Sequence, residues 1–160
     1  MAIGESIKGR KISEPLELSP HCEQLLQLLA ALRSLADAVA PADILQAVRY
    51  GNPAYRDWFA QMEATVGRLL TASLQGTNQE AAAIELAPYL VDSFGNRTRI
   101  DYGTGHEMTF VMFVCGLFKI GFLGSSDLRA VGLKVFAAYF DLGKGGVSEL
   151  QRFGSAFILC

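Results

Sequence analysis

Residues 104–118 read TGHEMTFVMFVCGLF, and this stretch decides the fold class. Thr104 and Glu107 have the T-x-x-E spacing of a capping box, in which the threonine oxygen accepts a first-turn N–H and the glutamate reaches back. The run from Met108 to Phe118 is apolar on nearly all sides, which is typical of a buried helix, and it is too short to span a bilayer. We therefore predict a central, buried helix that begins at Thr104.

The segments on either side of this helix carry further helix signals. Ser19 is a good N-cap, Pro20 suits the first helical position, and leucines at helical spacing follow as far as Val39. Pro41 is expected to end that helix. The other expected helices begin at Asn52-Pro53, run from Thr77 or Asn78 to about Phe94 with a kink or split at Pro88, and run from Ser126 or Asp127 to Phe140.

Strand signals are weak throughout the chain. Alternation of apolar and polar residues at period two is never sustained, and no Asn-Gly or Asp-Gly turn separates two β-rich runs. The predicted fold class is therefore all-α, a compact helical domain of about five helices. We divide the chain into a flexible N-terminal segment (1–17), a helical domain (18–140) and a C-terminal tail (141–160), whose early glycines break the helical pattern.

The composition excludes several classes of protein. A chain of 160 residues, 51% of them hydrophobic, is long enough for one domain with a real core and too apolar to be disordered. The formal net charge of -2, with both signs mixed along the chain, provides no electrostatic footprint for nucleic acid. No basic amphipathic stretch indicates binding to a membrane surface.

The cysteines favour a reducing compartment. Cys22, Cys115 and Cys160 form an odd, widely spaced set with neither a zinc spacing nor a disulfide framework. The polar stretch from Met1 to Glu17 contains no apolar run, so we do not expect it to be a secretory signal. We expect a cytoplasmic location, with the nucleus as a second one, and no metal site built by this chain alone.

The loop before the central helix reads GNRTRIDYGTGHE over residues 95–107. Glycines let a ligand approach the backbone, arginines match phosphate, and the first turn of a helix offers unpaired N–H groups. The residues that carry these properties, with neighbouring acid and base groups, are Arg97, Arg99, Asp101, Gly103, Gly105, His106 and Glu107. Residue types alone leave open whether the loop binds an anion or only makes the turn and caps the helix. It is not a zincin motif, because no second histidine follows four residues later.

A second distinctive stretch, residues 49–58, reads RYGNPAYRDW. One interpretation is a groove lined by aromatic rings and flanked by Arg49 and Arg56. The other interpretation is a simple helix start in which Tyr55 and Trp58 are core residues. Aromatic residues at helical spacing usually face inward, so spacing alone favours core packing.

Thr98 to Glu107, TRIDYGTGHE, resembles the signature of the phosphotyrosyl phosphatase activator family, whose members activate serine/threonine protein phosphatase 2A. Arg49 to Trp58 is similar to the upstream motif of that family. Lys119-Ile120-Gly121 and Leu133 to Phe136 follow the family pattern as well. The resemblance covers roughly Leu18 to Phe140, and two specific motifs in the right order argue against a chance match.

The resemblance implies an all-helical fold with a cleft that binds ATP with magnesium. It also implies a peptidyl-prolyl cis/trans isomerase activity directed at the catalytic subunit of phosphatase 2A, in company with its scaffold subunit, whose active conformation the activator restores. By position, the nucleotide phosphates would contact Arg99, Thr104 and Gly105, and the pocket would be shaped by Asp101, Tyr102, Gly103, His106 and Glu107. The partner-binding residues would be Arg49, Tyr50, Gly51, Asn52 and Arg56, and no catalytic residue is implied.

The chain departs from the family pattern after Phe140. Family chains continue with a long polar helix and two further motifs, and nothing in residues 141–160 resembles them. The resemblance assigns the acidic magnesium ligands and the rest of the nucleotide pocket to that missing part. The alternative function is therefore a truncated, non-catalytic helical binding module or an inactive isoform. Such a chain would expose an apolar patch on Met108–Phe118 and could self-associate through it.

Overall fold

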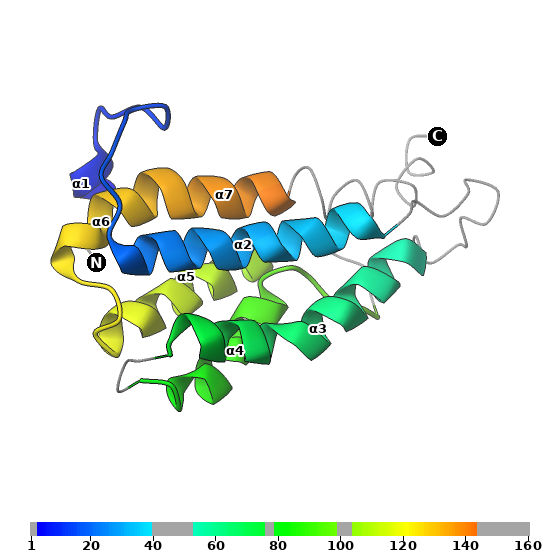
Figure 1. Cartoon of the computed structure of the whole chain (residues 1–160). Coiled ribbons are helices and arrows are strands. Elements are labelled where there is room, and N and C mark those ends of the chain that lie inside the picture. The colour runs from blue at the N-terminus through cyan, green and yellow to red at the C-terminus, as the bar shows by residue number, and fades with distance from the viewer. Residues whose placement is uncertain (1–2, 40–52, 76–78, 99–103, 144–160) are drawn as a thin grey trace, which may run out of the picture.

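The structure of the protein is a computed structural model, which describes residues 3–39, 53–75, 79–98 and 104–143 (Figure 1). Within these ranges the chain forms helices and no β-strand, which confirms the all-α fold class. The first helices are α1 (Ile3–Ile7), α2 (Pro20–Ala38), α3 (Pro53–Ser73), α4 (Ala82–Asp92) and α5 (Thr104–Lys119). A 3-10 turn (Ser125–Asp127) then leads into α6 (Leu128–Ala130), a π-helical segment (Val131–Val135) and α7 (Phe136–Asp141).

The helices close into a bundle. In chain order α2 packs on α3, α3 on α4 and α4 on α5, and α7 returns beside α2 (Figure 1). Aromatic side chains join α5 to α7 and so complete the bundle. The Phe110 ring stacks on the ring of Tyr139 with the two centroids 3.8 Å apart, and Phe136 meets Phe110 edge-on. Aromatic pairs of this kind stabilise a core beyond the area that they bury.

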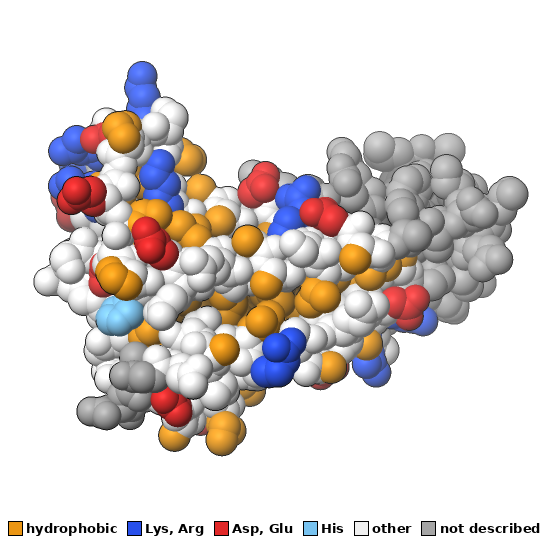
Figure 2. Space-filling model, in the orientation of Figure 1, with side chains coloured by type: hydrophobic (Ala, Val, Ile, Leu, Met, Phe, Trp, Pro, Cys, Tyr) orange, Lys and Arg blue, Asp and Glu red, His pale blue; other side chains and the backbone are white. Residues whose placement is uncertain are grey.

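Aromatic rings also fill the centre of the bundle. Tyr55, Trp58, Phe94 and Tyr139 are completely buried. The Phe94 ring contacts both the Trp58 ring and the Tyr139 ring, with centroid separations of 5.8 and 5.5 Å. On the face drawn in Figure 2, apolar side chains follow the seam beneath α2. The interpretation of Tyr55 and Trp58 as core residues is therefore confirmed.

Two long helices begin where the sequence predicts. Ser19 caps α2, because its Oγ accepts the backbone N–H three residues further on at 3.2 Å, and Pro20 is the first helical residue. α3 likewise begins at Pro53, where the missing proline N–H costs no hydrogen bond. The expected stop at Pro41 and the expected cap at Asn52 lie outside the described residues.

α4 begins later than the sequence predicts. Residues 77–78 lie outside the described part, and the helix starts at Ala82 after a turn in which the Ala82 N–H donates to the Gln79 carbonyl at 2.9 Å. One helix continues through Pro88, so the predicted split does not occur. Proline has no N–H for the carbonyl four residues earlier, but that residue, Ile84, is 84% exposed and its surroundings are open to water.

The expectation of a buried central helix holds for only one face of α5, and the other face has the exposed apolar patch that was expected of a truncated chain. Its inward face is buried, but Met108 and Met112 are 58% and 48% exposed, and Cys115 is exposed as well. The reason is that the described helices cover only one side of α5. The predicted capping box is not confirmed either, since the described contacts contain no bond between the Thr104 side chain and the backbone of Glu107.

The N-terminal segment has more structure than the sequence predicts. α1 packs on α6 and the π-helical segment. The Ile3 and Ile7 side chains lie so close to Gly132 that a Cβ atom there would come within 2.9 and 2.7 Å of them. Lys134 Nζ also donates to the Ile12 carbonyl at 2.7 Å. The three-part division of the chain stays a prediction, but its first part contains a docked helix.

Candidate functional site

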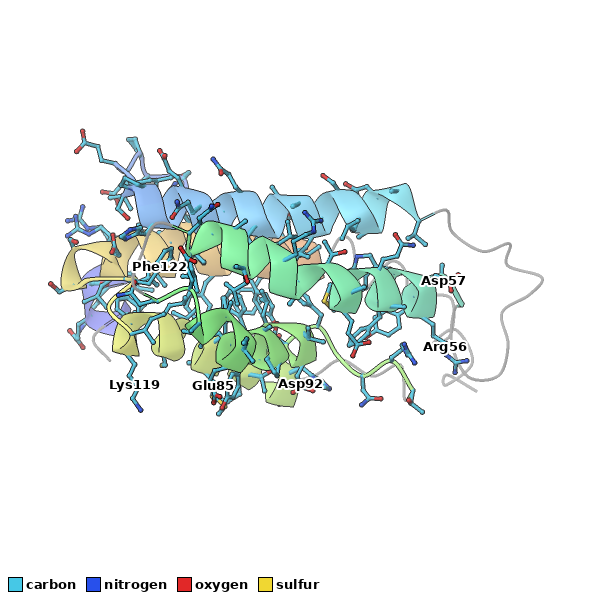
Figure 3. The ribbon with its side chains drawn as sticks, turned by 60° about the horizontal axis from the view of Figure 1, so that its bottom comes forward. Arg56, Asp57, Glu85, Asp92, Lys119 and Phe122 are labelled. Carbon is cyan, nitrogen blue, oxygen red and sulfur yellow. The ribbon has the colours of Figure 1, made fainter. Side chains whose placement is uncertain are left out.

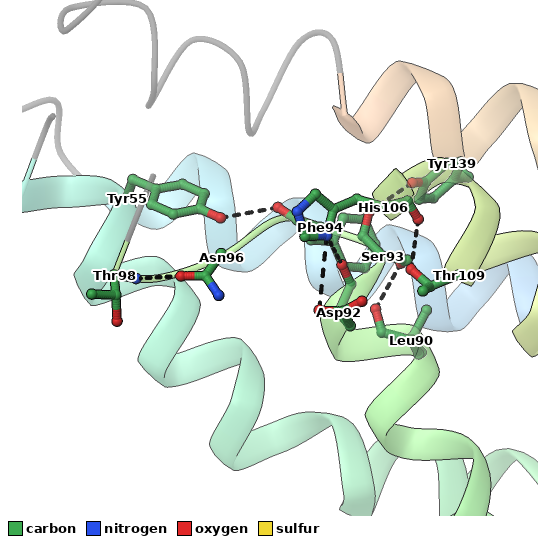
Figure 4. Close-up of polar contacts among 10 residues, drawn as sticks. All are labelled: Tyr55, Leu90, Asp92, Ser93, Phe94, Asn96, Thr98, His106, Thr109 and Tyr139. Carbon is green, nitrogen blue, oxygen red and sulfur yellow. Dashed lines mark hydrogen bonds and ion pairs between the residues drawn. The ribbon is translucent and has the colours of Figure 1, made fainter. Parts of the chain in front are cut away.

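The end of α4 and the start of α5 meet at a cluster of hydrogen bonds (Figure 4). Three successive carbonyls at the end of α4 each accept a side-chain donor from a different helix. His106 Nδ1 of α5 lies 2.6 Å from the Asp92 carbonyl, Tyr139 Oη of α7 donates to Ser93 at 2.7 Å, and Tyr55 Oη of α3 donates to Phe94 at 3.0 Å. We call these three carbonyls and three side chains the carbonyl clamp.

The carbonyl clamp satisfies the Ser93 and Phe94 carbonyls, which the helix end leaves without backbone partners, whereas the Asp92 carbonyl also accepts the Gly95 N–H at 3.2 Å. The last carbonyls of any α-helix have no intrahelical donor, and a buried unpaired carbonyl is costly. Ser93 and Phe94 are completely buried, so water cannot serve them. The chain turns away immediately afterwards at Gly95, whose φ of 109° is a conformation that other residues rarely adopt. The clamp therefore fixes the point at which the loop between α4 and α5, which we call the signature loop, leaves α4.

His106 holds α5 to α4 at this point. Its side chain is only 13% exposed, and Nδ1 also lies 3.8 Å from the carboxylate Oδ1 of Asp92. The Thr109 hydroxyl donates to the His106 carbonyl at 2.6 Å and braces the same turn of α5. The expectation that His106 shapes a nucleotide pocket stays a prediction. The structure shows a separate role for the same residue, which is its contact with the end of α4.

The first residues of α5 are open on their outer side. Thr104 and Gly105 are exposed, and a Cβ atom added at Gly105 would meet nothing within 4 Å. Glu107 is half-buried one turn further on. The structure thus leaves the start of α5 accessible to a ligand. The other predicted nucleotide residues, Arg99, Asp101, Tyr102 and Gly103, lie outside the described residues.

A groove that the sequence did not predict runs between α3 and α4 and reaches the signature loop. It has a volume of about 590 Å³, within the usual range of ligand pockets, and its lining includes Phe59, Val66, Pro88 and Val91. Its polar residues gather at the loop end, where Arg97 Nη1 lies 3.7 Å from Glu63 Oε2. The proline inside α4 was the signal in the sequence that could have pointed to this groove. The hollow itself exists only because α3 pairs with α4.

Of the predicted partner-binding residues, the structure describes Arg56. This side chain is exposed beside Asp57 at the start of α3, at the opposite end of the molecule from Lys119 and Phe122 (Figure 3). Its exposure is compatible with partner binding and does not test it. Arg49, Tyr50, Gly51 and Asn52 lie outside the described residues.

The described residues form no cluster of three or more His, Cys, Asp and Glu side chains that could hold a metal ion. None of their helices is both long and apolar enough to cross a bilayer.

Comparison with known proteins decides the family. The family model described as "Phosphotyrosyl phosphate activator (PTPA) protein" matches residues 1–150. The chain belongs to the phosphotyrosyl phosphatase activator family. The match extends beyond both ends of the region 18–140 on which the resemblance was predicted, and it includes both motifs.

Relatives that are named as phosphatase 2A activators agree with this family assignment. The chain is 39% identical over 147 residues to the serine/threonine-protein phosphatase 2A activator of Drosophila melanogaster. This match covers 92% of this chain and 35% of the Drosophila protein. It is 36% identical over 150 residues to the probable serine/threonine-protein phosphatase 2A activator 1 of Dictyostelium discoideum, covering 94% of this chain and 44% of that protein. The chain thus spans less than half the length of these activators.

The fold agrees with a solved activator structure. The crystal structure of the PP2A phosphatase activator Ypa1 matches with a TM-score of 0.76 and 27% sequence identity. The match covers 88% of this chain and 43% of the Ypa1 chain. The bundle described above is therefore one part of the activator fold.

Proposed function

We propose that this chain takes part in activating a type 2A serine/threonine phosphatase, by catalysing cis/trans isomerisation of a prolyl bond in the catalytic subunit. The observation that carries the proposal is the family match over residues 1–150, together with relatives that are named as phosphatase 2A activators. The catalytic subunit, with its scaffold subunit, is the proposed partner.

The chemistry of such an isomerase is limited, because no bond is broken. Rotation about an X–Pro bond faces a barrier of about 18–20 kcal/mol, and a site accelerates it by binding the twisted amide more tightly than the planar one. Apolar walls with a few polar groups suit that task. No residue of this chain is assigned as catalytic.

We also propose ATP as a ligand, with its phosphates at the start of α5. Exposed Thr104 and Gly105 would offer backbone N–H groups, and Arg99 would add a guanidinium group. Asp101, Tyr102, Gly103 and Glu107 would border the nucleotide. Magnesium would accompany the ATP, and no described residue is proposed as its ligand.

The enzymatic proposal is tested with a protease-coupled proline-peptide assay in the presence of ATP and magnesium. We expect isomerisation above the uncatalysed rate and, in parallel, reactivation of a purified phosphatase 2A catalytic subunit. Absence of both activities in folded protein would overturn the proposal.

The nucleotide proposal has its own test, which is ATP titration by calorimetry. Arg99→Ala should weaken binding roughly 10-fold, the usual effect of losing a charge-assisted hydrogen bond. Arg97→Ala is the matched control, because Arg97 pairs with Glu63 and has no proposed contact with the nucleotide. Equal affinity of both variants for ATP would contradict the assignment of Arg99.

A specific observation favours a second function, that of a non-catalytic binding module that self-associates. Met108, Met112 and Cys115 form an exposed stripe along one face of α5. The stripe lies between Glu107 near the start of the helix and Lys119 at its end. Two copies packed antiparallel about a two-fold axis would bury both stripes and bring each Lys119 towards the Glu107 of the other copy.

Light scattering during size-exclusion chromatography tests this second function. We expect wild type to form a dimer and the double substitution Met108→Glu, Met112→Glu to be monomeric. Ile84→Glu is the control, because Ile84 is 84% exposed on α4, where it lines the groove, and should leave the dimer intact. A monomeric wild type at high concentration would exclude self-association.

A further inference from the structure

The contact between His106 and the Asp92 carbonyl determines where the imidazole proton lies. The Nδ1 atom of His106 is 2.6 Å from the carbonyl oxygen of Asp92. A carbonyl oxygen can only accept a hydrogen bond, so Nδ1 must carry the proton, and in the neutral ring Nε2 is then the acceptor nitrogen. The Asp92 carboxylate lies 3.8 Å from the same nitrogen and favours the proton there as well.

We infer that His106 is held as the Nδ1–H tautomer and acts as a positioning residue that fixes the first turn of α5 against the end of α4. The inference deepens the proposed function and rests on it where nucleotide binding is concerned. His106 lies in the first turn of α5, and Asp92 is the last residue of α4. One hydrogen bond therefore ties together the two helix ends from which the signature loop emerges.

The other members of the carbonyl clamp cannot replace this contact. Tyr55 and Tyr139 belong to α3 and α7, and they hold the neighbouring carbonyls of Phe94 and Ser93. Their hydroxyls anchor the end of α4 to the bundle. The Tyr139 ring also stacks on Phe110 in the second turn of α5, but neither hydroxyl contacts the first turn of that helix. His106 is the clamp residue that belongs to α5, and so it positions the amides at the start of that helix relative to α4.

The tautomer also limits what His106 can recognise. Any group that contacts Nε2 of the neutral ring must donate a hydrogen bond, as a hydroxyl, an amino group or an amide N–H does. While the ring is neutral, a phosphate oxygen, which accepts, is excluded as a partner of that nitrogen. The inferred role thus differs from that of the phosphate-binding residues: His106 sets geometry and selects a donor.

Nuclear magnetic resonance of the imidazole nitrogens tests the tautomer directly. The chain has only two histidines, so uniformly ¹⁵N-labelled protein yields two sets of long-range ring signals. The set that disappears in His106→Asn belongs to His106. At alkaline pH we expect its Nδ1 to have the shift of a protonated nitrogen and its Nε2 that of an unprotonated one. The reverse pattern would overturn the inference.

Two matched variants test the positioning role. Asparagine places an N–H donor near the position of Nδ1, whereas glutamine places it near Nε2. We expect His106→Asn to retain the wild-type melting temperature. His106→Gln should lower the melting temperature and bind ATP about 10-fold more weakly than His106→Asn, because the Asp92 carbonyl then loses the donor that α5 supplies. Equal behaviour of the two variants would contradict the inference.

Failure of the nucleotide proposal and failure of the inference about His106 can be told apart. If wild type does not bind ATP, the nucleotide proposal fails, while the ring signals and the difference in melting temperature between the asparagine and glutamine variants still decide the role of His106. If wild type binds ATP but the ring signals show an Nε2–H tautomer, the inference about His106 fails alone.

Discussion

At the scale of single residues, the stability of this protein depends on a few buried polar groups with one good partner each. Tyr139 illustrates the point, because its ring stacks on Phe110 while its hydroxyl donates to the Ser93 carbonyl at 2.7 Å. The same side chain thus closes the bundle and satisfies the end of α4. Ser93 adds a bond of its own, from Oγ to the Leu90 carbonyl at 2.7 Å.

Tyr139→Phe should separate these two contributions. The ring stays, but the Ser93 carbonyl loses its donor in a site that water cannot reach, so we expect a loss of about 1–3 kcal/mol in the free energy of unfolding. Urea denaturation measures it. Tyr89→Phe serves as the control, because no described contact involves the hydroxyl of this half-buried residue. Equal losses in both variants would show that the hydrogen bond from Tyr139 to the Ser93 carbonyl contributes nothing.

Cys22 should make stability depend on pH in the alkaline range. Burial raises the pKa of its thiol above the ordinary value of 9.0, and nearby Asp127 raises it further, while a hydrogen bond from Ser19 opposes the shift. The unfolded chain therefore releases this proton first. The stabilising contribution is complete below the ordinary pKa and is lost as pH rises through the folded one. The difference in unfolding free energy between wild type and Cys22→Ala should narrow as the pH rises above the ordinary thiol pKa of 9.0. A constant difference would contradict this.

At the scale of helices, close approach depends on glycines whose missing side chains leave room for a neighbour. Gly132 allows α1 to lie on the π-helical segment, and Gly116 of α5 faces the Leu86 side chain of α4, which occupies the space of a Cβ atom. Gly67 on α3 faces open space instead. The same residue type thus has opposite consequences at different positions in the bundle.

Substitution of these glycines by alanine should have opposite signs. Gly67→Ala should stabilise the protein by about 0.5–1 kcal/mol, since alanine is the better helix former and meets no neighbour. Gly132→Ala should destabilise it and loosen α1, because the new methyl group would collide with Ile3 and Ile7. Thermal melting measures both effects. Faster tryptic cleavage after Lys8 or Arg10 would report the release of α1 in Gly132→Ala, and unchanged cleavage would contradict its docking.

At the scale of the whole molecule, one face of α5 is buried in the core and the other face is exposed. Phe110 and Phe113 point into the core, while Met108 and Met112 lie on the outside. The chain spans 35% of the Drosophila activator and 44% of the Dictyostelium one. The activity of those longer proteins therefore remains a proposal for this chain, and the open face of α5 is where the two candidate functions differ most.

Substitutions on the two faces of α5 should differ sharply. Phe110→Ala removes the stack that closes α5 onto α7 and leaves a cavity, so we expect a loss of about 3–5 kcal/mol. Met112→Ala removes a side chain that is 48% exposed and should cost under about 1 kcal/mol in the monomer. Chemical denaturation followed by circular dichroism measures both. A large loss in Met112→Ala would mean that its open face is covered in solution.

Much of the fold was predictable because helix signals are local. The Ser19-Pro20 start of α2 and the Pro53 start of α3 depend on backbone geometry within one turn, and both are confirmed. The TRIDYGTGHE signature identified the family for a similar reason, since a contiguous motif can be recognised without a fold. Amino-acid sequence alone thus determined the helical class, most helix starts and the family.

Only the tertiary structure decided how these helices meet. The bonds of Tyr55 and Tyr139 to the end of α4 join residues 39 and 46 positions apart, and no local pattern predicts such a pairing. The groove between α3 and α4 arises in the same way, from two helices whose facing sides need not match. The apolar sequence of α5 left two expectations, a buried helix and, for a truncated chain, an exposed patch. Only the structure decided between them, because an apolar sequence indicates which side chains avoid water, but burial also requires a neighbour to cover them.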